Sequence, residues 1–383
     1  MDVTSPLPAL FAVLLALATC CVLLRRSAVV PDSNRFATID GLRGYLAFFV
    51  FLHHTAIWYF YARTHTWAPP PSNLYENFGA ASVALFFMIT AFLFYSKIIH
   101  AREKSLNWTQ LFISRIVRLM PLYLVVMLLM FFIVICLSAG EWRDPLVKLV
   151  KDSLRWLSFS TFGEPDLNGV AGTRFIIADV NWSLPYEWLF YMVLPIIALI
   201  HRVAAPPWFY LISLAAIGAA FIWKPHAIHL ASFLSGLIAA QLYSNDSFRA
   251  RARHPIASII ALSCWLVAVL FFPTTNAALP LALLSVSFIL IAGGANLFGL
   301  LLLPASRLLG EMAYSIYLLH GITLFALFTF VLPDANRFTP TQHWLLILAL
   351  TPLLVGLCHL SFRLIERPAM GQTPRLLRWL KPS

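Results

Sequence analysis

The sequence predicts an all-α fold, a polytopic bundle of transmembrane helices. Hydrophobic residues make up 60% of the 383 residues and charged residues only 11%, whereas soluble proteins are about half apolar and a quarter charged. The mean hydropathy is +0.81, and apolar runs long enough to cross a bilayer recur along the chain. This composition excludes a soluble globular fold, because too few polar residues are present to cover its surface.

Eleven apolar segments are expected to span the membrane. The first one resembles a signal peptide, but it lacks a basic start and a small-residue cleavage site, and Arg25 and Arg26 follow it. We therefore interpret it as a retained helix. The approximate ranges are 7–24, 43–61, 79–97, 119–138, 185–201, 207–223, 227–243, 255–272, 278–303, 312–332 and 343–363.

The chain divides into three parts. Residues 1–34 form an additional N-terminal transmembrane helix and a linker, and residues 35–369 form the main transmembrane domain. Residues 370–383 form a basic cytoplasmic tail, whose Arg/Leu/Trp pattern predicts a short helix on the inner membrane surface. No internal repeat is present.

The basic residues predict the orientation in the membrane. The net charge of +11 would favour nucleic-acid binding in a soluble protein, but in a membrane protein basic residues collect in cytoplasmic loops. With the N-terminus outside, nineteen of the 27 lysines and arginines lie on the cytoplasmic side, and five of the other eight fall in the long loop 139–181. We expect a multi-pass protein of the inner cell membrane, with its C-terminus in the cytoplasm and no nucleic-acid partner.

The five cysteines all lie in apolar runs, and no pair has the spacing of metal ligands. Cysteines in such surroundings are usually packing residues. We expect neither a disulfide nor a bound metal ion.

Arg43 and His54 are the most informative ionisable residues of the second apolar segment. They lie eleven residues apart, so a helix places them three turns apart on one face, with His54 about 16 Å deeper. Imidazole titrates near neutral pH and can act as a base. The alternatives are a helix-packing histidine and a cytoplasmic anchor arginine; for His53, next in the chain, we favour packing.

Two further segments carry polar side chains. Arg115 and Arg118 lie three residues apart, on one helical face, and suit either a phosphate group or a lipid headgroup. Glu187 lies in an aromatic stretch and suits an arginine partner or sugar hydroxyl groups. In that stretch Trp182 is either a stacking face or part of the aromatic belt at the interface.

Near the C-terminus, Tyr314, Tyr317 and His320 are spaced by one helical turn. They either line a polar cavity or cross-link helices by hydrogen bonds. Glu366 ends the last apolar segment on the side expected to hold Arg43, where it suits the orientation of Arg43 or of another basic group.

These residues belong to five motifs that occur in order between residues 39 and 368. They are Arg43 with His54 after ten residues; Arg115-Ile-Val-Arg118 before Pro121; Trp182-Ser-Leu-Pro-Tyr-Glu187 before Phe190 and Tyr191; Ala313-Tyr-Ser-Ile-Tyr-Leu-Leu-His320; and Ile365-Glu-Arg-Pro368. Together they resemble the membrane-bound acyltransferase-3 family. The chain departs from the family pattern by its additional first helix, by Ala313 in place of serine and by Ala91 in place of glycine.

The resemblance implies a ten-helix transferase core that transfers an acyl group from cytoplasmic acyl-CoA, most often acetyl-CoA, to a hydroxyl of an extracytoplasmic carbohydrate or lipid-linked sugar. Acyl-CoA is then a co-substrate, and no cofactor is bound permanently. His54, Arg43 and Glu366 would form the catalytic set, and Arg115 and Arg118 would bind acyl-CoA. The residues that would contact the acceptor or support the site are Asp40, Trp182, Ser183, Glu187, Tyr314, Tyr317 and His320.

Other interpretations remain open at this stage. His54 would act either as a general base or as a transient carrier of the acyl group. A polytopic transporter or flippase of an envelope sugar or lipid, or a scaffold protein, also fits a chain with polar residues in its spans. The absence of an inverted repeat argues against a transporter. The sequence does not predict the acceptor or the oligomeric state.

Overall fold

The computed structural model describes residues 2–26, 36–101 and 106–379. All secondary-structure elements named within these residues are helices. This confirms the all-α prediction. The helices are α1 (Pro6–Arg26), α2 (Ala37–Thr64), α3 (Asn73–Ala101), α4 (Trp108–Leu137), α5 (Leu146–Leu157), α6 (Leu184–Ala198), α7 (Pro207–Trp223), α8 (Ala227–Tyr243), α9 (Asp246–Ala252), α10 (Pro255–Phe271), α11 (Ala278–Gly293), α12 (Pro304–Glu311), α13 (Ala313–Ala326), α14 (Pro340–Ser361), α15 (Arg367–Met370) and α16 (Thr373–Trp379).

The protein is a multi-pass membrane protein. Each of the eleven expected spans overlaps a helix, but six segments of the described chain are long and apolar enough to cross a bilayer alone. A seventh arises if α8 and α9, which are bent by 107°, form one broken span. Helices α7, α10 and α11 are apolar but shorter, so the count of eleven stays a prediction. The six segments are Pro6–Arg25, Asn73–Ala101, Trp108–Leu137, Asn181–His201, Ala313–Val331 and Pro340–Trp379.

Several element boundaries differ from those expected. The span 278–303 is too long, because α11 ends at Gly293, and Gly294 follows with a φ of 129°. The segment 139–181 contains α5, whose apolar residues recur every three or four positions and lie exposed on one face. Such a helix is typical of a membrane interface. The expected tail helix is α16, whereas the proposed domain boundary at residues 34 and 35 lies outside the described residues.

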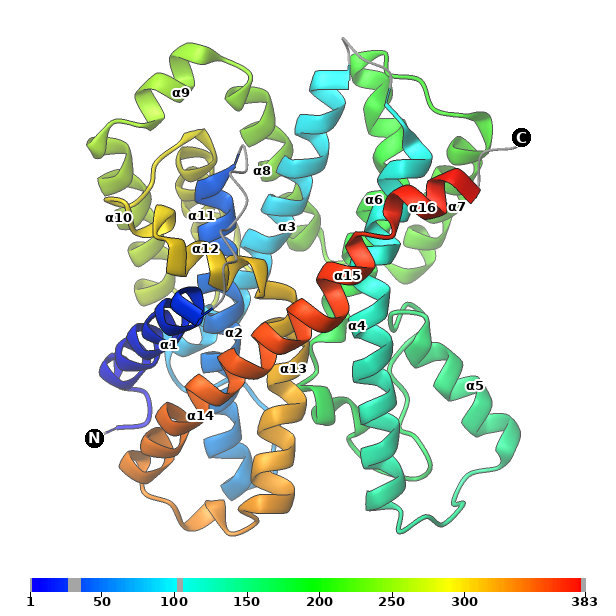
Figure 1. Ribbon diagram of the computed structural model, residues 1–383, viewed down its shortest axis with the longest axis vertical. Coiled ribbons are helices and arrows are strands. Elements are labelled where there is room, and N and C mark those ends of the chain that lie inside the picture. Colours follow the sequence, from blue (N-terminus) through cyan, green and yellow to red (C-terminus); the bar gives the residue numbers. More distant parts are fainter. Residues whose placement is uncertain (1, 27–35, 102–105, 380–383) are drawn as a thin grey trace.

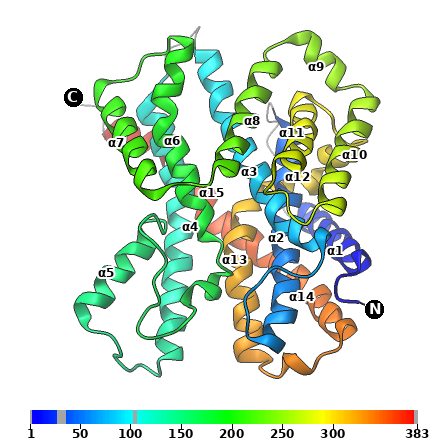
Figure 2. The ribbon, with the colours of Figure 1, turned by 180° about the vertical axis from the view of Figure 1, so that it is seen from behind.

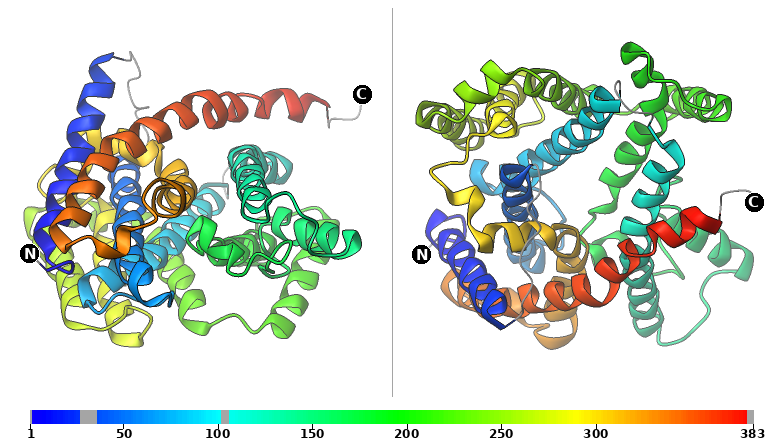
Figure 3. Two further views of the ribbon diagram at one scale, coloured as in Figure 1. Left: turned by 90° about the horizontal axis from the view of Figure 1, so that it is seen from below. Right: turned by 45° about the horizontal axis from the view of Figure 1, so that its top comes forward.

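Helix α2 occupies the centre of the bundle. It contacts α3, α12 and α13, and the segment α14–α16 crosses in front of α2, α13 and α4 as one long bent rod (Figure 1). Seen from behind, α8, α10 and α11 cover the α3 side (Figure 2). Helix α1 lies at the edge of the molecule against α12 and α14, away from α4 and α5 (Figure 3). A side chain that points inward from α2 is therefore surrounded by protein.

Glycines bring two pairs of helices into close contact. A Cβ atom at Gly310 of α12 would lie 1.7 Å from the carbonyl oxygen of Asp40, so only glycine fits where α12 crosses α2. A Cβ at Gly236 of α8 would lie 2.7 Å from the Cβ of Ala91. At the α3–α8 crossing, the glycine that permits close contact is therefore Gly236 of α8. This explains how Ala91 of α3 fits where the family pattern has glycine.

Candidate active site

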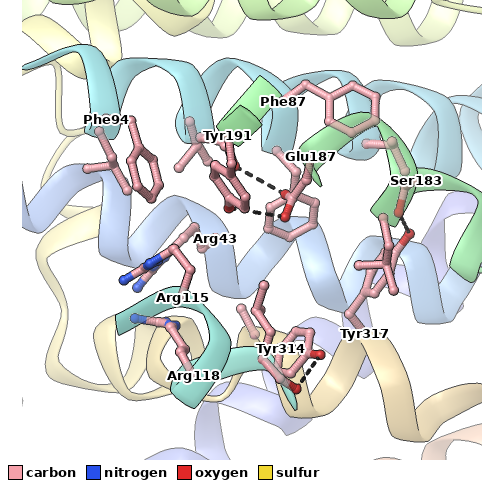
Figure 4. Close-up of a pocket in the computed structure, with 18 residues that line it drawn as sticks. Arg43, Phe87, Phe94, Arg115, Arg118, Ser183, Glu187, Tyr191, Tyr314 and Tyr317 are labelled. Atoms are coloured by element: carbon pink, nitrogen blue, oxygen red, sulfur yellow. Dashed lines mark hydrogen bonds between the residues drawn. The ribbon is translucent and has the colours of Figure 1, made fainter. Parts of the chain in front are cut away.

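A cavity of about 120 Å³ lies among α2, α3, α4, α6 and α13. One end of it is lined by arginines and the other end by tyrosines and Ser183 (Figure 4). The cavity collects six of the predicted site residues that are far apart in the sequence together with Arg43. These six are Arg115, Arg118, Ser183, Glu187, Tyr314 and Tyr317.

The arginine end carries positive charge with few partners. Arg43 donates to Asp40 at 2.9 Å, but the Nε atoms of Arg43 and Arg115 are buried and have no hydrogen-bond partner among the described residues. Asn107 caps α4 by accepting from the main chain of Gln110, and this start places Arg115 and Arg118 toward the cavity. Buried cations need compensating negative charge, so this end suits an anionic ligand.

Glu187 faces the same cavity from the first turn of α6. Its carboxylate accepts from the Thr90 hydroxyl at 3.1 Å and from the Tyr191 hydroxyl at 3.3 Å (Figure 4). Two neutral donors thus hold it, and it forms no ion pair with an arginine of the described chain. The cavity therefore contains a fixed acceptor group beside three cations.

Tyr314 and Tyr317 both line a polar cavity and cross-link elements by hydrogen bonds, the two roles between which the sequence did not decide. Tyr314 and Tyr317 line the cavity, and each also links two elements. Tyr314 donates to the carbonyl of Leu119 at 2.9 Å. The Tyr317 hydroxyl lies 2.8 Å from that of Ser183 and donates to the carbonyl of Val180 at 2.9 Å.

His54 and His320 form a buried pair. The Nδ1 atom of His320 donates to the carbonyl of Ile316 at 2.8 Å, so its Nε2 is the acceptor in a neutral ring. That Nε2 lies 3.1 Å from Nδ1 of His54, which also donates to the carbonyl of Val50 at 2.9 Å. These bonds place the proton of neutral His54 on Nδ1. The Nε2 atom of His54 then has the lone pair that a general base requires.

Tyr317 separates the histidine pair from the cavity. Its ring centroid lies 6.4 Å from that of His320, and neither His54 nor His320 lines the cavity that contains Arg43. The sequence predicts a shared helical face for Arg43 and His54. The structure places Arg43 at the cationic end and His54 beyond the tyrosine end.

Glu366 and Trp182, which are predicted site residues, and His53, which neighbours His54, do not line the cavity. Glu366 is buried and accepts from Ser315, so it does not pair with Arg43, whose carboxylate partner is Asp40. It lies in a π-helical turn, Phe362–Glu366, and such turns frequently occur at functional sites. Trp182 packs on His229 at 5.1 Å outside the cavity. His53 is a packing residue, as expected, because its ring fills the space beside Gly79.

Between α5 and α6, two carboxyl groups lie close together. Burial, followed by the charge of Asp179, raises the pKa of Glu164 to about 8. Burial also raises the pKa of Asp179, although Arg174 opposes this increase. Ala178 and Asp179 both have left-handed φ angles, 56° and 55°. Such angles cost non-glycine residues about 1–3 kcal/mol each and cluster at functional sites.

The sequence does not single out Thr90 as a site residue, although it is the one polar residue in the apolar run 83–94. The sequence also does not single out Trp58 and Trp67, which lie around His54. Nothing in the local sequence distinguishes these tryptophans from residues of an aromatic belt. Their role depends on contacts between segments that only the fold brings together.

The sequence model of the acyltransferase-3 family, described as an acyltransferase domain, matches residues 36–362. The chain belongs to this family. Helix α1 precedes the matched residues, and the Glu366 motif lies just beyond them. The protein is thus a membrane acyltransferase, which confirms the predicted enzyme class over the transporter and scaffold alternatives. No curated protein and no solved structure matches the acyltransferase.

Proposed function

We propose that this acyltransferase moves an acetyl group from cytoplasmic acetyl-CoA to a hydroxyl group of a carbohydrate or lipid-linked sugar outside the inner membrane. One observation carries the proposal. A cavity with three arginines ends beside a histidine pair whose hydrogen bonds leave Nε2 of His54 able to accept a proton. An anionic donor and a proton-removing group are the two things that acyl transfer from a thioester requires.

The donor binds through its phosphate groups. Arg43, Arg115 and Arg118 supply guanidinium groups, which pair with phosphates in fixed, bidentate geometry. The cavity of about 120 Å³ is too small for the whole donor, so the arginines hold only its phosphate groups there. Nineteen of the 27 lysines and arginines lie on one side of the expected spans, and basic residues collect on the cytoplasmic side. This distribution favours a cytoplasmic arginine end and C-terminus, with the N-terminus outside.

His54 takes the proton of the acceptor hydroxyl as its oxygen attacks the thioester carbonyl. The carbon–oxygen bond of the ester forms, the carbon–sulfur bond breaks, and the proton passes from His54 to the sulfur of coenzyme A. His320 is a positioning residue, because its Nε2 accepts from Nδ1 of His54 and holds the required tautomer. A covalent acyl-histidine is the alternative route.

The test uses purified protein in lipid vesicles together with carbon-labelled acetyl-CoA. We expect release of coenzyme A and transfer of label to envelope sugars, matched by mass spectrometry of envelope glycans from cells with and without the gene. Label that stays in acetyl-CoA while a sugar or lipid crosses the membrane would overturn the proposal.

A further inference from the structure

An aromatic cluster lies beside His54 and includes none of the residues that line the arginine cavity. The indole of Trp67, from the segment between α2 and α3, lies 6.1 Å from the His54 ring at 27°. It stacks on Phe175 of the 3₁₀ helix Thr173–Ile177, at 4.7 Å and 17°. Tyr61 meets both rings edge-on, at 5.3 and 5.8 Å. Trp67, Phe175 and Tyr61 are all half-buried, so part of this aromatic surface is accessible.

Trp58 adds a polar group to this surface. It lies one helical turn beyond His54, is 4% exposed, and its Nε1 atom has no hydrogen-bond partner among the described residues. Its ring neighbours are Trp67, Phe325, Phe328 and Tyr61, and the Tyr61 hydroxyl, the one hydroxyl oxygen among these rings, does not accept from it. A buried indole N–H is normally bonded. This donor is therefore available to an oxygen atom of a bound molecule.

Charged groups lie at the rim of the same surface. The Arg174 guanidinium lies 5.1 Å above the Phe175 ring and 3.8 Å from the Asp179 carboxylate. The main chain of Ile177 and Ala178, in the left-handed turn, lies against α13 at Gly321. Gly321 permits this approach, because a Cβ there would lie 2.4 Å from the main chain of Ile177. The fold thus gathers aromatic rings, one unpaired donor and two charged groups near Trp67, whose ring stacks on His54.

We infer that Trp58, Trp67 and Phe175 form the acceptor subsite, which receives a sugar ring and directs one of its hydroxyl groups toward His54. This inference rests on the proposed function. The apolar C–H groups of a sugar pack against the exposed edges of Trp67 and Phe175, because these two rings stack on each other and Arg174 lies over Phe175. Trp58 donates to a sugar oxygen, and Arg174 and Asp179 bind further hydroxyl groups. A simple alkyl alcohol would use only the aromatic faces, so the polar groups favour a sugar.

Two substitutions test the subsite in the full-length protein. Trp67→Ala removes the aromatic contact, and Trp58→Phe keeps the ring contacts but removes the N–H group. Trp142→Ala is the matched control, because Trp142 is 72% exposed and belongs to neither site. The probes are carbon-labelled acetyl-CoA and membrane vesicles that carry the native envelope glycans. Both acetyl-CoA binding and transfer of label to sugar are measured.

We expect Trp67→Ala to lower transfer at least about tenfold and Trp58→Phe about three- to tenfold, through a higher KM for the acceptor. The affinity for acetyl-CoA should stay within about twofold of wild type, because the arginine cavity is separate. Full transfer in both variants, or an equal loss of donor binding, would overturn the subsite. If wild-type protein transfers no label to sugar, the proposed function itself fails, and the subsite fails with it.

Discussion

The arginine end and the histidine end of the polar region differ in how their basic side chains are bonded. At one end, Arg43 and Arg115 keep buried Nε atoms without partners among the described residues. At the other end, Nδ1 of His54 and of His320 is bonded to a main-chain carbonyl, and the rings are bonded to each other. Tyr317 stands between these ends.

Under the proposed function, this difference separates binding of the acyl donor from proton transfer. Arginines whose charge is only partly neutralised in a low-dielectric interior attract an anion strongly but carry out no proton transfer at neutral pH. A hydrogen-bonded histidine with a fixed tautomer binds no anion in its neutral form but is ready to accept a proton. Substitutions at the histidine end should therefore change the catalytic rate. Substitutions at the arginine end should change the affinity for the acyl donor.

The largest effect is expected at the histidine end. His54→Ala should lower kcat for acyl transfer about 10³-fold, because a general base contributes about 10²–10⁴-fold. Its affinity for acetyl-CoA should remain within about twofold of wild type, since His54 lies outside the cavity. Single-turnover transfer and equilibrium binding, measured on the same preparation, check both expectations.

A change of fold in His54→Ala would confuse this result, so thermal unfolding must match that of wild type. His53→Ala is a useful companion, because His53 is the neighbouring residue with a packing role. It should lower the unfolding temperature and leave kcat of the folded fraction nearly unchanged. A well-folded His54→Ala protein with full activity would remove His54 from the mechanism.

The next effect is expected at the arginine end. Arg115→Gln or Arg118→Gln should raise KM for acetyl-CoA about 10- to 100-fold, because each loses a charge-assisted bond of about 1.5–3 kcal/mol. The value of kcat at saturating donor should change much less. Arg375→Gln is the matched control, since Arg375 lies exposed on α16 outside the cavity. An unchanged KM, or a fall in kcat alone, would contradict the assigned division.

Much of this arrangement was predictable, because a membrane makes ionisable residues in spans conspicuous. The all-α bundle followed from composition, and the spacing of Arg115 and Arg118 was enough to place both on one face of a helix. The positions of Glu187, Tyr314 and Tyr317 in one cavity followed only in outline. The sequence named them as polar residues near the ends of helices, and the fold brought them together.

The rest depended on contacts that no local pattern encodes. Asp40, three residues before Arg43, is the ion-pair partner of Arg43. The sequence offered Glu366 instead because it lies at the same expected membrane depth. The partition by Tyr317, the contact of Trp67 with His54 and the left-handed turn at Ala178 all join segments from different parts of the chain. Periodicity predicts which face of a helix is apolar, but it does not predict which helix covers that face.

The smallest expected effect concerns the carboxyl pair beside the aromatic surface. The pKa of Glu164 is raised from 4.5 to about 8, first by burial and then by the charge of Asp179. The folded protein therefore holds this proton more tightly than the unfolded chain does. The resulting stabilisation is complete below pH 4.5 and is lost as the pH rises through about 8. Glu164→Gln removes this dependence, because the amide does not titrate.

The unfolding temperature of wild type should thus fall between about pH 5 and pH 9 relative to that of Glu164→Gln, by at least about 2 °C for a chain of this size. Glu141→Gln is the control, because this glutamate side chain is 72% exposed. Thermal unfolding in one detergent across this pH range measures the difference. Parallel curves for wild type and Glu164→Gln would show that the pair ionises without cost. Glu164 would then not be a neutral carboxyl group near the histidine end. Only the neutral histidines would distinguish that end from the arginine end.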